Sequence, residues 1–531
     1  MDLSGTSFIG ANRGSQGKDS FRAVAPASGA EAEPRYYSAS REEVERTATL
    51  GAEAFEVYRR VPPATRANLL KLIARKLEAS QEQLIERAHL ESALPLPRLK
   101  GEIARTSGQL RLFAQVAEEC SWTSPRIDHA DPARKPQPKP DVRSMLRPLG
   151  PVVVFGASNF PFAFSVAGGD TASALAAGNP VIVKAHSAHP GTSELVALAI
   201  QQSVRECGLP GGVFSMLFDS GVSVGAELVK HPLVKAAAFT GSLPAARALF
   251  DLAMKRPEPI PFYGEMGSTN PLFVLPGALE AFTDKIAGDL FNSFTLGAGQ
   301  YCTKPGLVFL NEGKAAEQFT LTFQSKVEAS LPFTLLTSGI GASFGRELRA
   351  RESKTGLQTL AKGTSPAASL ETSATATVFQ TDVPSFLKDA HLAEEHFGPS
   401  TILIAYKQKQ EILECARNLA GQLTATIHAT QADLEAYAEL VPILETKVGR
   451  IIFNSYPTGL EVCHAIIHGG PYPATTDPRT TSVGSLAITR FARPVCYQDC
   501  PAPALPPELR EANPLGIWRL VDGEFTNRKG D

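Results

Sequence analysis

Two kinds of hydrophobic pattern divide the chain. Between residues 40 and 120, apolar residues recur at three- and four-residue spacing with charges between them, which is typical of amphipathic helices. After Leu149, short apolar runs such as 151–156 and 180–185, in which Lys184 is the single charge, each precede a longer helical pattern. Uncharged runs of this length fit strands that are buried on both faces of a sheet. The alternation predicts a doubly wound α/β fold built on a parallel sheet.

A second alternation of strands and helices begins near Asn270 and predicts another α/β domain. Helices are expected over 278–296 and 315–331. Buried strands are expected over 401–406 and 449–454, where apolar residues run without charges at their centres.

Three segments lie outside these alternations. Residues 1–37 are expected to be an irregular start that contains one or two strands. Residues 124–141 are rich in proline and charge, so they are expected to form a connection or an extended arm rather than a core element. The segment 481–509 is expected to contain one strand followed by a proline-rich stretch.

Charge and composition restrict the classes of function. The 531 residues include 52 Lys and Arg against 54 Asp and Glu, which leaves a formal charge of −2. Proteins that bind nucleic acid carry a large basic excess, so no nucleic-acid partner is expected. Apolar residues make up 43% and charged residues 20% of the chain, which excludes disorder of the chain as a whole.

Cysteine usage and the apolar runs bear on the compartment. Seven cysteines in a chain of this length are sparse and odd in number, which favours a reducing compartment over a disulfide scaffold. The N-terminus has no signal-peptide pattern, and the longest uncharged run, 151–169, is interrupted by Asn159, Pro161 and several Gly and Ser. We therefore expect a cytoplasmic protein without a membrane partner.

Three residues at the predicted ends of elements could take part in a reaction. Cys302 lies in a glycine-rich turn, where it is either a nucleophile, which must react as the thiolate, or a small buried core residue. Glu265 ends a predicted strand, where parallel sheets place ligand groups, although an ion-paired boundary residue fits equally. The side-chain amide of Asn159 could donate to an oxyanion, or Asn159 could simply form a turn before a helix.

Other strand ends are candidates for cofactor binding. Gly241 and Ser242 lie between a predicted strand and a predicted helix, where backbone N–H groups suit a phosphate. Lys184 ends another strand. The usual GxGxxG dinucleotide fingerprint does not follow the first strand, so none of these signals identifies a cofactor by itself.

Taken in order, six motifs make the chain resemble the aldehyde dehydrogenase superfamily. Glu265, Cys302 and Glu395 lie 37 and 93 positions apart, and the resemblance extends over nearly the whole chain. The motifs are SNFP, VIVK, FTGS, EMGSTNP, GQYC and EEHFGP. The resemblance implies a Rossmann-type doubly wound cofactor domain, an α/β catalytic domain and a small β arm for oligomerisation.

The same resemblance sets the expected domain boundaries, and it implies a homodimer or a homotetramer joined through the arm. The expected segments are a cofactor-binding domain at 1–123 and 148–266, a catalytic domain at 267–478, an oligomerisation arm at 124–147 and 479–505, and a C-terminal tail at 506–531.

The resemblance also implies the roles of the catalytic residues. Cys302 attacks the aldehyde carbonyl as a thiolate, and the Asn159 side chain and the Cys302 backbone N–H hold the resulting oxyanion. Hydride then leaves for the nicotinamide, and Glu265 activates the water that hydrolyses the remaining thioester. The substrate is a small-molecule aldehyde, the product is a carboxylic acid, and no metal is expected.

By the same similarity, five residues contact the cofactor. Lys184 corresponds to the adenosine-ribose lysine, Glu395 to the nicotinamide-ribose carboxylate, and Phe397 lies near the nicotinamide. Gly241 and Ser242 correspond to the turn at the pyrophosphate.

One departure from the family concerns the choice between NADP and NAD. The carboxylate that usually repels a 2′-phosphate is replaced here by Ser187, whose hydroxyl can donate to phosphate. NADP is therefore expected to be accepted, while preference over NAD stays open because no arginine lies nearby to bind the phosphate.

Three further segments indicate a branch of the superfamily. They are KAHSAHPGTS, HGGPYPATT at 468–476 and FARPVCYQDCP. They look like the branch of bacterial α-ketoglutaric semialdehyde (2,5-dioxopentanoate) dehydrogenases and NADP-dependent fatty aldehyde dehydrogenases. We expect 2,5-dioxopentanoate as substrate, with fatty or general aliphatic aldehydes as the alternative. His468 matches a histidine near the catalytic pocket of that branch, where it tunes the thiol, contacts substrate or makes only a structural hydrogen bond.

Two other readings remain. A CoA-acylating member of the superfamily commonly lacks the hydrolytic glutamate, so Glu265 argues against it. A non-catalytic binding or structural protein on the same fold is disfavoured because Cys302, Glu265 and Asn159 occur together.

Overall fold

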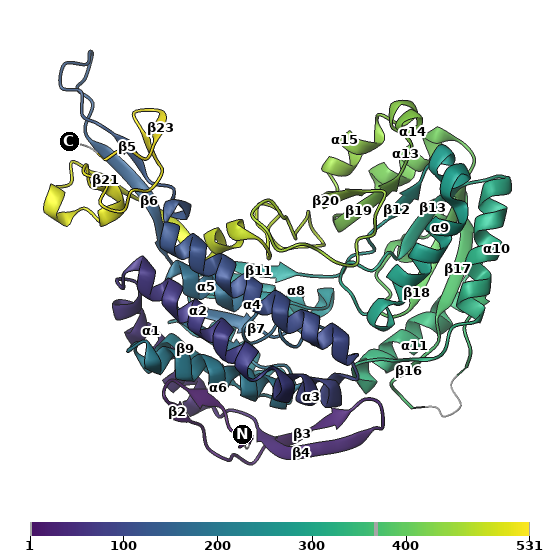
Figure 1. The fold of residues 1–531 in the computed structure, drawn as a ribbon, viewed down its shortest axis with the longest axis horizontal. Helices are drawn as coiled ribbons and strands as arrows, with labels where there is room; N and C mark the ends of the chain where they lie inside the picture. The colour runs from purple at the N-terminus through teal and green to yellow at the C-terminus, as the bar shows by residue number, and fades with distance from the viewer. Residues whose placement is uncertain (1–2, 366–369, 530–531) are drawn as a thin grey trace.

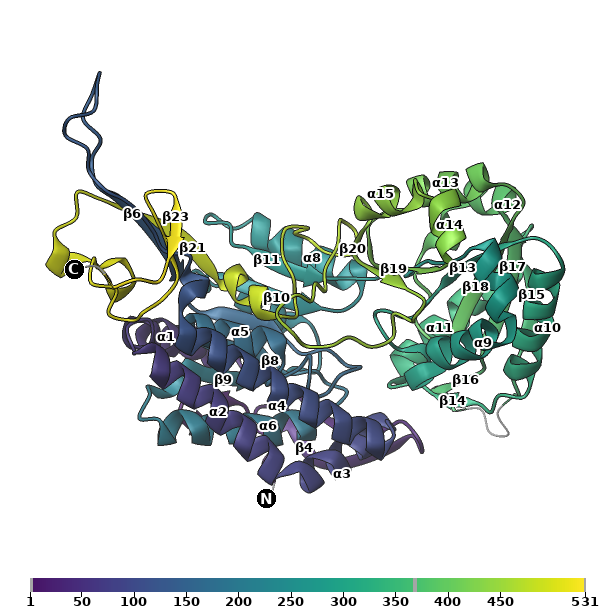
Figure 2. The same cartoon turned by 45° about the horizontal axis from the view of Figure 1, so that its top comes forward.

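The computed structural model describes residues 3–365 and 370–529. It has two large α/β lobes and a smaller arm that extends from one of them (Figures 1 and 2). The expected α/β class with parallel sheets is confirmed. Among the described residues, no helix combines the length and the apolar character that crossing a membrane requires.

The first lobe is built on a sheet of five parallel strands extended by two short antiparallel ones. The strands lie in the order β11, β10, β7, β8, β9, β1, β2, so the chain runs outward from β7 in both directions. In such sheets ligands bind at the carboxyl ends beside the point of reversal, here between β7 and β10. The bounds are β1 Phe8–Ile9, β2 Asn12–Arg13, β7 Val152–Phe155, β8 Val181–Lys184, β9 Phe214–Leu217, β10 Ala236–Thr240 and β11 Phe262–Glu265.

Helices cover both faces of this sheet because successive side chains of a strand point to opposite sides. Val152 and Val154 of β7 pack in the cluster that contains α2, α4, α5 and α6, whereas Val153 and Phe155 pack against α1, α7 and α8. The uncharged runs of the sequence therefore reflect burial on both faces. The bounds are α1 Arg41–Tyr58, α2 Pro63–Ala79, α3 Gln81–Ser92, α4 Leu96–Glu119, α5 Gly169–Ala177, α6 Pro190–Glu206, α7 Ser223–Lys230 and α8 Leu243–Met254.

The second lobe contains another sheet of seven strands, in the order β15, β17, β18, β13, β12, β19, β20. All neighbours are parallel except β15, which pairs antiparallel with β17 at the edge. The bounds are β12 Leu272–Val274, α9 Pro276–Thr295, β13 Leu307–Asn311, α10 Lys314–Glu328, α11 Ser338–Glu352, β15 Gln358–Lys362, β17 Thr377–Asp382, α12 Val383–Lys388, β18 Ser400–Tyr406, α13 Lys409–Asn418, β19 Gln422–His428, α14 Gln431–Ala436, α15 Leu440–Glu445 and β20 Val448–Phe453.

Strand β19 was not predicted, because polar residues interrupt its apolar run. All seven of its residues are nevertheless buried. Gln422 shows why this is tolerated: its side-chain oxygen accepts hydrogen bonds from the hydroxyl of Ser268 and the backbone N–H of Thr269. A buried polar group that is hydrogen-bonded costs little, and these partners are distant in the sequence.

The arm is a five-stranded sheet in the order β21, β6, β5, β22, β23. Residues 506–531 were expected to form a separate tail, but β22 pairs parallel with β5, so the tail belongs to the arm sheet. Leu505 and Leu509 anchor it by packing on Ile127 and Met145. Strands of three residues give no periodic signal, which explains the incorrect expectation. The bounds are β5 Arg126–Asp128, β6 Val142–Pro148, β21 Ala492–Gln498, β22 Arg519–Val521 and β23 Glu524–Thr526.

Two further details differ from the sequence expectations. The helix α5, which the pattern after 151–156 predicts, begins only at Gly169, because the preceding residues form turns that bring Gly168 against the Ala163 backbone. The segment after β20 returns to the first lobe, where the backbone N–H of Thr476 donates to the Gly264 carbonyl of β11 at 3.0 Å. The expected boundary at 478 therefore does not separate this segment from the first lobe.

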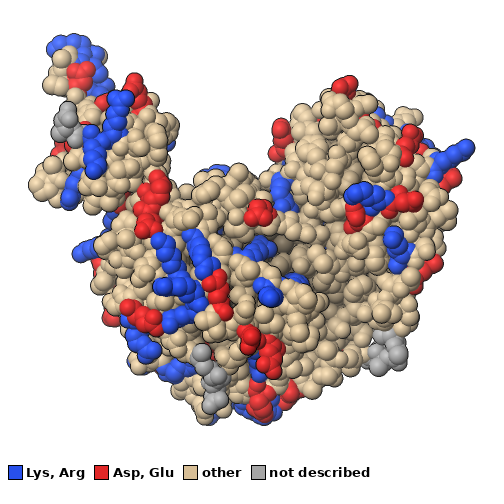
Figure 3. Space-filling view, viewed as in Figure 1, with Lys and Arg blue, Asp and Glu red and all other residues tan. Residues whose placement is uncertain are grey.

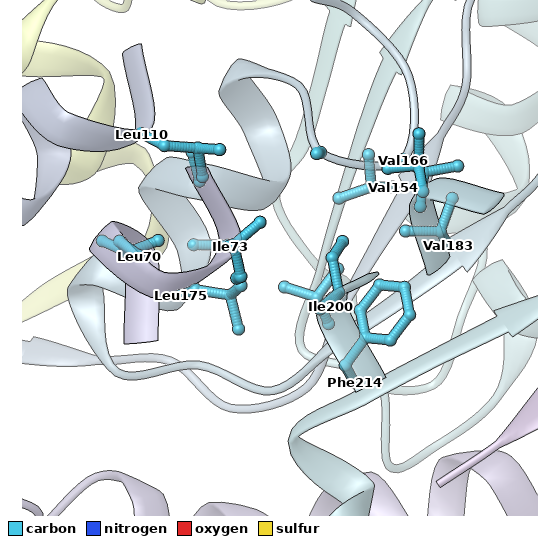
Figure 4. Packing of buried hydrophobic residues seen from close by; sticks show 14 of the residues in the cluster. Leu70, Ile73, Leu110, Val154, Val166, Leu175, Val183, Ile200 and Phe214 are labelled. Carbon is cyan, nitrogen blue, oxygen red and sulfur yellow. The ribbon is translucent and has the colours of Figure 1, made fainter. Parts of the chain in front are cut away.

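The core between the helices and the first sheet yields a stability prediction. Leu110 of α4 is fully buried in the cluster that Figure 4 shows, with Leu70 and Ile73 of α2 and Leu175 of α5. Replacing Leu110 by Ala should lower the free energy of unfolding by about 3 kcal/mol, because the cavity adds to the lost burial. Leu321→Ala is the control, since Leu321 is 64% exposed. Urea unfolding followed by fluorescence would contradict this if both variants had the same midpoint.

Candidate active site

Three side chains from distant parts of the sequence meet where the two lobes face each other. Glu265 ends β11, Cys302 lies in the loop before β13, and His468 lies in the segment that returns to the first lobe. Their donor atoms lie within 4.8 Å of one another. A thiol, a carboxylate and an imidazole at this spacing also form a donor set that a zinc ion takes.

The imidazole of His468 lies between the other two groups. Its Nε2 is 2.9 Å from Glu265 Oε1 and 3.6 Å from Cys302 Sγ. The second carboxylate oxygen of Glu265 accepts a hydrogen bond from the hydroxyl of Ser482 at 2.7 Å. His468 Nδ1 is buried and has no partner among the described residues. The Glu265 carboxylate is thus held from both sides while one face of it stays close to the thiol.

The charges in this group act in opposite directions on the thiol and the carboxylate. Burial raises the pKa of Cys302 well above the usual thiol value, and the Glu265 carboxylate raises it further. Burial also opposes ionisation of Glu265, but the charge and hydrogen bond of His468 and the hydrogen bond of Ser482 outweigh it, so the pKa of Glu265 is lowered. In the free protein, a protonated thiol therefore lies beside an ionised carboxylate that can accept its proton.

Two asparagines fix the loop that holds Cys302. Asn270 Nδ2 donates to the carbonyls of Cys302, at 2.8 Å, and Lys304, at 3.0 Å. Asn159 Nδ2 donates to the carbonyl of Gln300 at 3.0 Å, so its amide lies beside the same loop. Arg98 in turn donates to the Asn159 carbonyl at 2.7 Å. The structure thus brings Asn159 to the catalytic loop, as the sequence motif predicts.

Lys304 ties the Glu395 segment to this loop. Its buried ammonium donates to the carbonyls of His396 and Ser400, at 2.8 and 2.7 Å. Burial raises the pKa of Glu395 to about 7 and lowers that of Lys304 to about 7. The charge of each group opposes this shift, because it favours the ionised form of the other. A Cβ added at Gly267 would lie 2.6 Å from Glu395 Oε2, so the carboxylate rests on the backbone just after Glu265. Phe397 is partly buried in the same segment.

The other candidate cofactor residues lie along the carboxyl edge of the first sheet. Lys184 ends β8, and burial lowers the pKa of its ammonium although Asp219 opposes this. Gly241 follows β10, and its N–H donates to the Glu265 carbonyl at 3.1 Å. Ser242 is the N-cap of α8 and its side chain makes no capping hydrogen bond. Among the described residues, no contact joins Lys184 or Ser187 to the catalytic group, so their roles stay predictions.

Several site residues were missed by the sequence reasoning. Asn270 lies inside the EMGSTNP motif and Lys304 follows GQYC by two positions, so their place in the motifs could have indicated them. Ser482 gives no local signal, because its contact with Glu265 spans 217 positions. Arg105 of α4 was hidden among the other charges of an amphipathic helix.

Comparison with known proteins agrees with this geometry. Residues 13–471 match the model of the aldehyde dehydrogenase family. The chain is 45% identical over 525 residues to α-ketoglutaric semialdehyde dehydrogenase 2 of Azospirillum brasilense, covering 99% of this chain and 100% of that protein. It is 46% identical over 492 residues to α-ketoglutaric semialdehyde dehydrogenase of Acinetobacter baylyi, covering 92% and 93%.

A solved structure supports the fold independently. The NADP-dependent glyceraldehyde-3-phosphate dehydrogenase from Bacillus halodurans C-125, complexed with NADP, superposes with a TM-score of 0.78 at 20% identity. The match covers 94% of this chain and 99% of that one.

The electrostatics of the three-residue group can be tested in the free protein. Glu265→Gln removes the negative charge that opposes thiolate formation, so iodoacetamide should alkylate Cys302 several-fold faster at pH 8. Mass spectrometry of the Cys302 peptide separates this reaction from that of the other six cysteines. The exposed Glu394→Gln serves as a control and should leave the rate unchanged. Slower or equal alkylation of Glu265→Gln would contradict the proposed effect of this carboxylate on the thiol.

Proposed function

Because the chain belongs to the aldehyde dehydrogenase family, we propose that it oxidises 2,5-dioxopentanoate to 2-oxoglutarate with NADP or NAD. The meeting of Cys302, Glu265 and His468 within 4.8 Å supports catalysis. The choice of substrate is supported by the two α-ketoglutaric semialdehyde dehydrogenases that are 45% and 46% identical. As a member of the family, the chain is an oxidoreductase that converts an aldehyde to an acid.

In the first half of the reaction, Cys302 is the nucleophile. Its proton leaves to water or to the Glu265 carboxylate, and the thiolate adds to the aldehyde carbon. The carbonyl oxygen becomes an anion that the Cys302 N–H and the Asn159 amide stabilise. An amide carries two donors, and only one of those of Asn159 is used by the Gln300 carbonyl, so the other is available.

The cofactor is proposed to lie across the carboxyl edge of the first sheet. Lys184 is proposed to bind the adenosine ribose, because this half-buried residue has neither a hydrogen bond nor an ion pair at its ammonium among the described residues. Ser242, the N-cap of α8, offers a hydroxyl that makes no capping hydrogen bond, and Gly241, whose N–H donates to the Glu265 carbonyl, forms the turn beside it, which suits a pyrophosphate. The buried Glu395 carboxylate is suited to a ribose hydroxyl. A bound nicotinamide would supply the hydride acceptor for oxidation of the Cys302 thiohemiacetal to a thioester.

In the second half, Glu265 is the general base for hydrolysis. It takes a proton from water, whose oxygen adds to the thioester carbon, and the acid is released as Cys302 regains its thiol form. Ser482 and His468 orient the carboxylate by binding both of its oxygens. His468 is thus proposed to act mainly through Glu265 and the thiol.

Use of NADP is proposed from Ser187, where the carboxylate usual in the family is replaced by a hydroxyl. A hydroxyl can donate to a 2′-phosphate and does not repel it. The NADP bound by the Bacillus halodurans protein is consistent with this, although its 20% identity supports only the fold. A cytoplasmic location is proposed because all seven cysteines are free, including the reactive one.

A fatty or general aliphatic aldehyde is the second candidate substrate. The apolar cluster beside the catalytic loop favours it, since an apolar lining would accept a hydrocarbon chain. This cluster contains Ala157, Phe160, Ala163, Phe164 and Val483, with Tyr301, Leu460, Val462 and Ile466 packed against it.

The proposed reaction predicts the behaviour of two variants on a panel of aldehydes. Cys302→Ala should lose NAD(P)H formation with every aldehyde, because no thiol remains to form the adduct. Glu265→Gln should give a burst of about one NAD(P)H per active site and then a rate reduced at least ~100-fold, because the thioester persists. Wild-type kcat/KM should be highest for 2,5-dioxopentanoate. A higher value for octanal would favour the second substrate instead, and full activity of Cys302→Ala would refute the mechanism.

The arm is proposed to join subunits into a homodimer or a homotetramer. It extends away from the first lobe, and β21 forms one edge of its sheet (Figure 1). An unpaired strand edge is able to pair with another chain. Gel filtration with light scattering should give a mass of two or four subunits. A proline in place of Val495, in the centre of β21, should shift the protein towards the monomer, and a monomeric wild type would contradict the proposal.

A further inference from the structure

Arg105 of α4 is a partly buried cation without a counter-ion. Its Nε and Nη2 are buried and have no partner, and it makes no ion pair among the described residues. The nearby carboxylate of Glu102 favours the charge of Arg105 from a distance but makes no ion pair with it. Glu102 Oε1 accepts from the N–H groups of Phe162 and Ala163 at 2.8 and 3.0 Å, and its Oε2 has no partner among the described residues. Burial also raises the pKa of Glu102. A buried cation in this state is costly unless an anion binds to it.

Aromatic rings direct this guanidinium towards the entrance to the catalytic loop. Its carbon lies 5.1 Å from the centre of the Phe164 ring and 5.6 Å from that of Phe160. The Phe164 ring is 6.0 Å from the ring of His468, which touches Cys302. The Phe160 ring is 5.2 Å from that of Tyr301, the residue before Cys302. Arg105 is therefore linked to Cys302 through the contacts of these aromatic side chains, and the Cys302 charge acts on its pKa.

A second guanidinium faces the same space. Arg450 of β20 donates to the carbonyls of Pro457 and Gly459, at 2.9 and 3.2 Å, and its buried Nε has no partner among the described residues. Burial lowers its pKa; the Cys302 thiolate opposes this change and the charge of Arg105 adds to it. The two arginines are thus close enough to repel each other, and neither has an acidic partner within 4.0 Å in the described part of the chain.

Arg98 contacts the same Phe160 ring as Arg105, but it makes a hydrogen bond within the protein. Its Nη2 donates to the carbonyl of Asn159, and its guanidinium lies 4.8 Å from the centre of the Tyr301 ring. These contacts hold the residue that is proposed to bind the oxyanion. Arg98 also keeps a buried Nε and Nη1 without partners, but Arg105 makes ring contacts alone and no hydrogen bond among the described residues, so its guanidinium is available to a ligand.

We propose that Arg105, assisted by Arg450, binds the carboxylate at the far end of the substrate and thereby selects aldehydes that end in a carboxylate. This inference rests on the proposed function and names the group that determines its specificity. A guanidinium matches a carboxylate with two parallel hydrogen bonds, and stacking on Phe160 and Phe164 holds its plane. The aromatic cluster contacts the carbon chain between the two ends.

Figure 3 agrees with this assignment at the level of the whole face. The surface is hollowed between the two lobes, with Lys or Arg atoms in this hollow and Asp or Glu atoms at its rim. A positive group at the entrance attracts anionic substrates.

The test compares two aldehydes of equal chain length, 2,5-dioxopentanoate and pentanal. Arg105→Met should lower kcat/KM for 2,5-dioxopentanoate by about 100-fold and change that for pentanal by less than about 3-fold, because only the first carries a carboxylate. Arg105→Lys should recover part of the loss, and Arg450→Met should give a smaller loss with the same selectivity. Arg111→Met is the control, since Arg111 lies on the same helix but pairs with Glu78 at the surface.

Two results would overturn the inference. The first is that both Met variants leave the ratio of the two kcat/KM values unchanged, which includes an equal loss for both aldehydes. The second is a loss in Arg111→Met as large as that in Arg105→Met. If the melting temperature shows that Arg105→Met does not fold, the test uses Arg105→Lys and Arg450→Met instead. The inference then requires that these variants lower the ratio of kcat/KM for 2,5-dioxopentanoate to kcat/KM for pentanal.

A binding measurement separates this inference from the choice of substrate. Pentanoate should protect Cys302 of the wild type from iodoacetamide, pentanol should not, and Arg105→Met should abolish the protection. If the wild type prefers pentanal to 2,5-dioxopentanoate but pentanoate protects through Arg105, the proposed substrate is wrong and the carboxylate site stands. Equal protection of wild type and Arg105→Met shows that Arg105 does not bind carboxylates.

Discussion

The contact between the carboxyl end of β11 and the loop before β13 is the constraint on which the site depends. It places the Glu265 carboxylate, from one lobe, beside the Cys302 thiol, from the other, in a largely buried space. A buried carboxylate is tolerated only with partners, and Ser482 and His468 supply them from the segment that returns to the first lobe. The site therefore forms only if the end of β11, the loop before β13 and the returning segment all come together at the same place.

The second feature is the way charge is distributed around the thiol. Glu265 and Glu395 supply two buried carboxylates, and Lys304 compensates the second of them while tying its segment to the catalytic loop. Arg105 and Arg450 remain without acidic partners among the described residues. The carboxylates raise the pKa of the free thiol, whereas the nearest arginine acts against them. Positive and negative groups thus act on the same thiol in opposite directions.

Much of the fold was predictable from local patterns. The uncharged runs at β7 and β8 gave the parallel sheet because burial on both faces excludes charge from the strands. The family match confirms the resemblance to aldehyde dehydrogenases. From the sequence alone, that resemblance predicted that Cys302, Glu265, Asn159 and Glu395 belong to one active site. The strands β19, β22 and β23 were not predicted, because polar side chains or short length remove the periodic signal while distant partners stabilise them.

The sequence alone determined the fold class, the membership of a family and the chemical types at the site, since these follow from periodicity and from motifs of a few adjacent residues. Only the tertiary structure decided which groups share one buried space. Ser482 reaches Glu265 across 217 positions, and His468 reaches it across 203. Arg105 looked like one more solvated charge of α4, and only the packing of α4 against Phe160 and Phe164 shows that it lacks a counter-ion. The physical reason is that desolvation and Coulomb interaction depend on distance in space, which the order of residues does not contain.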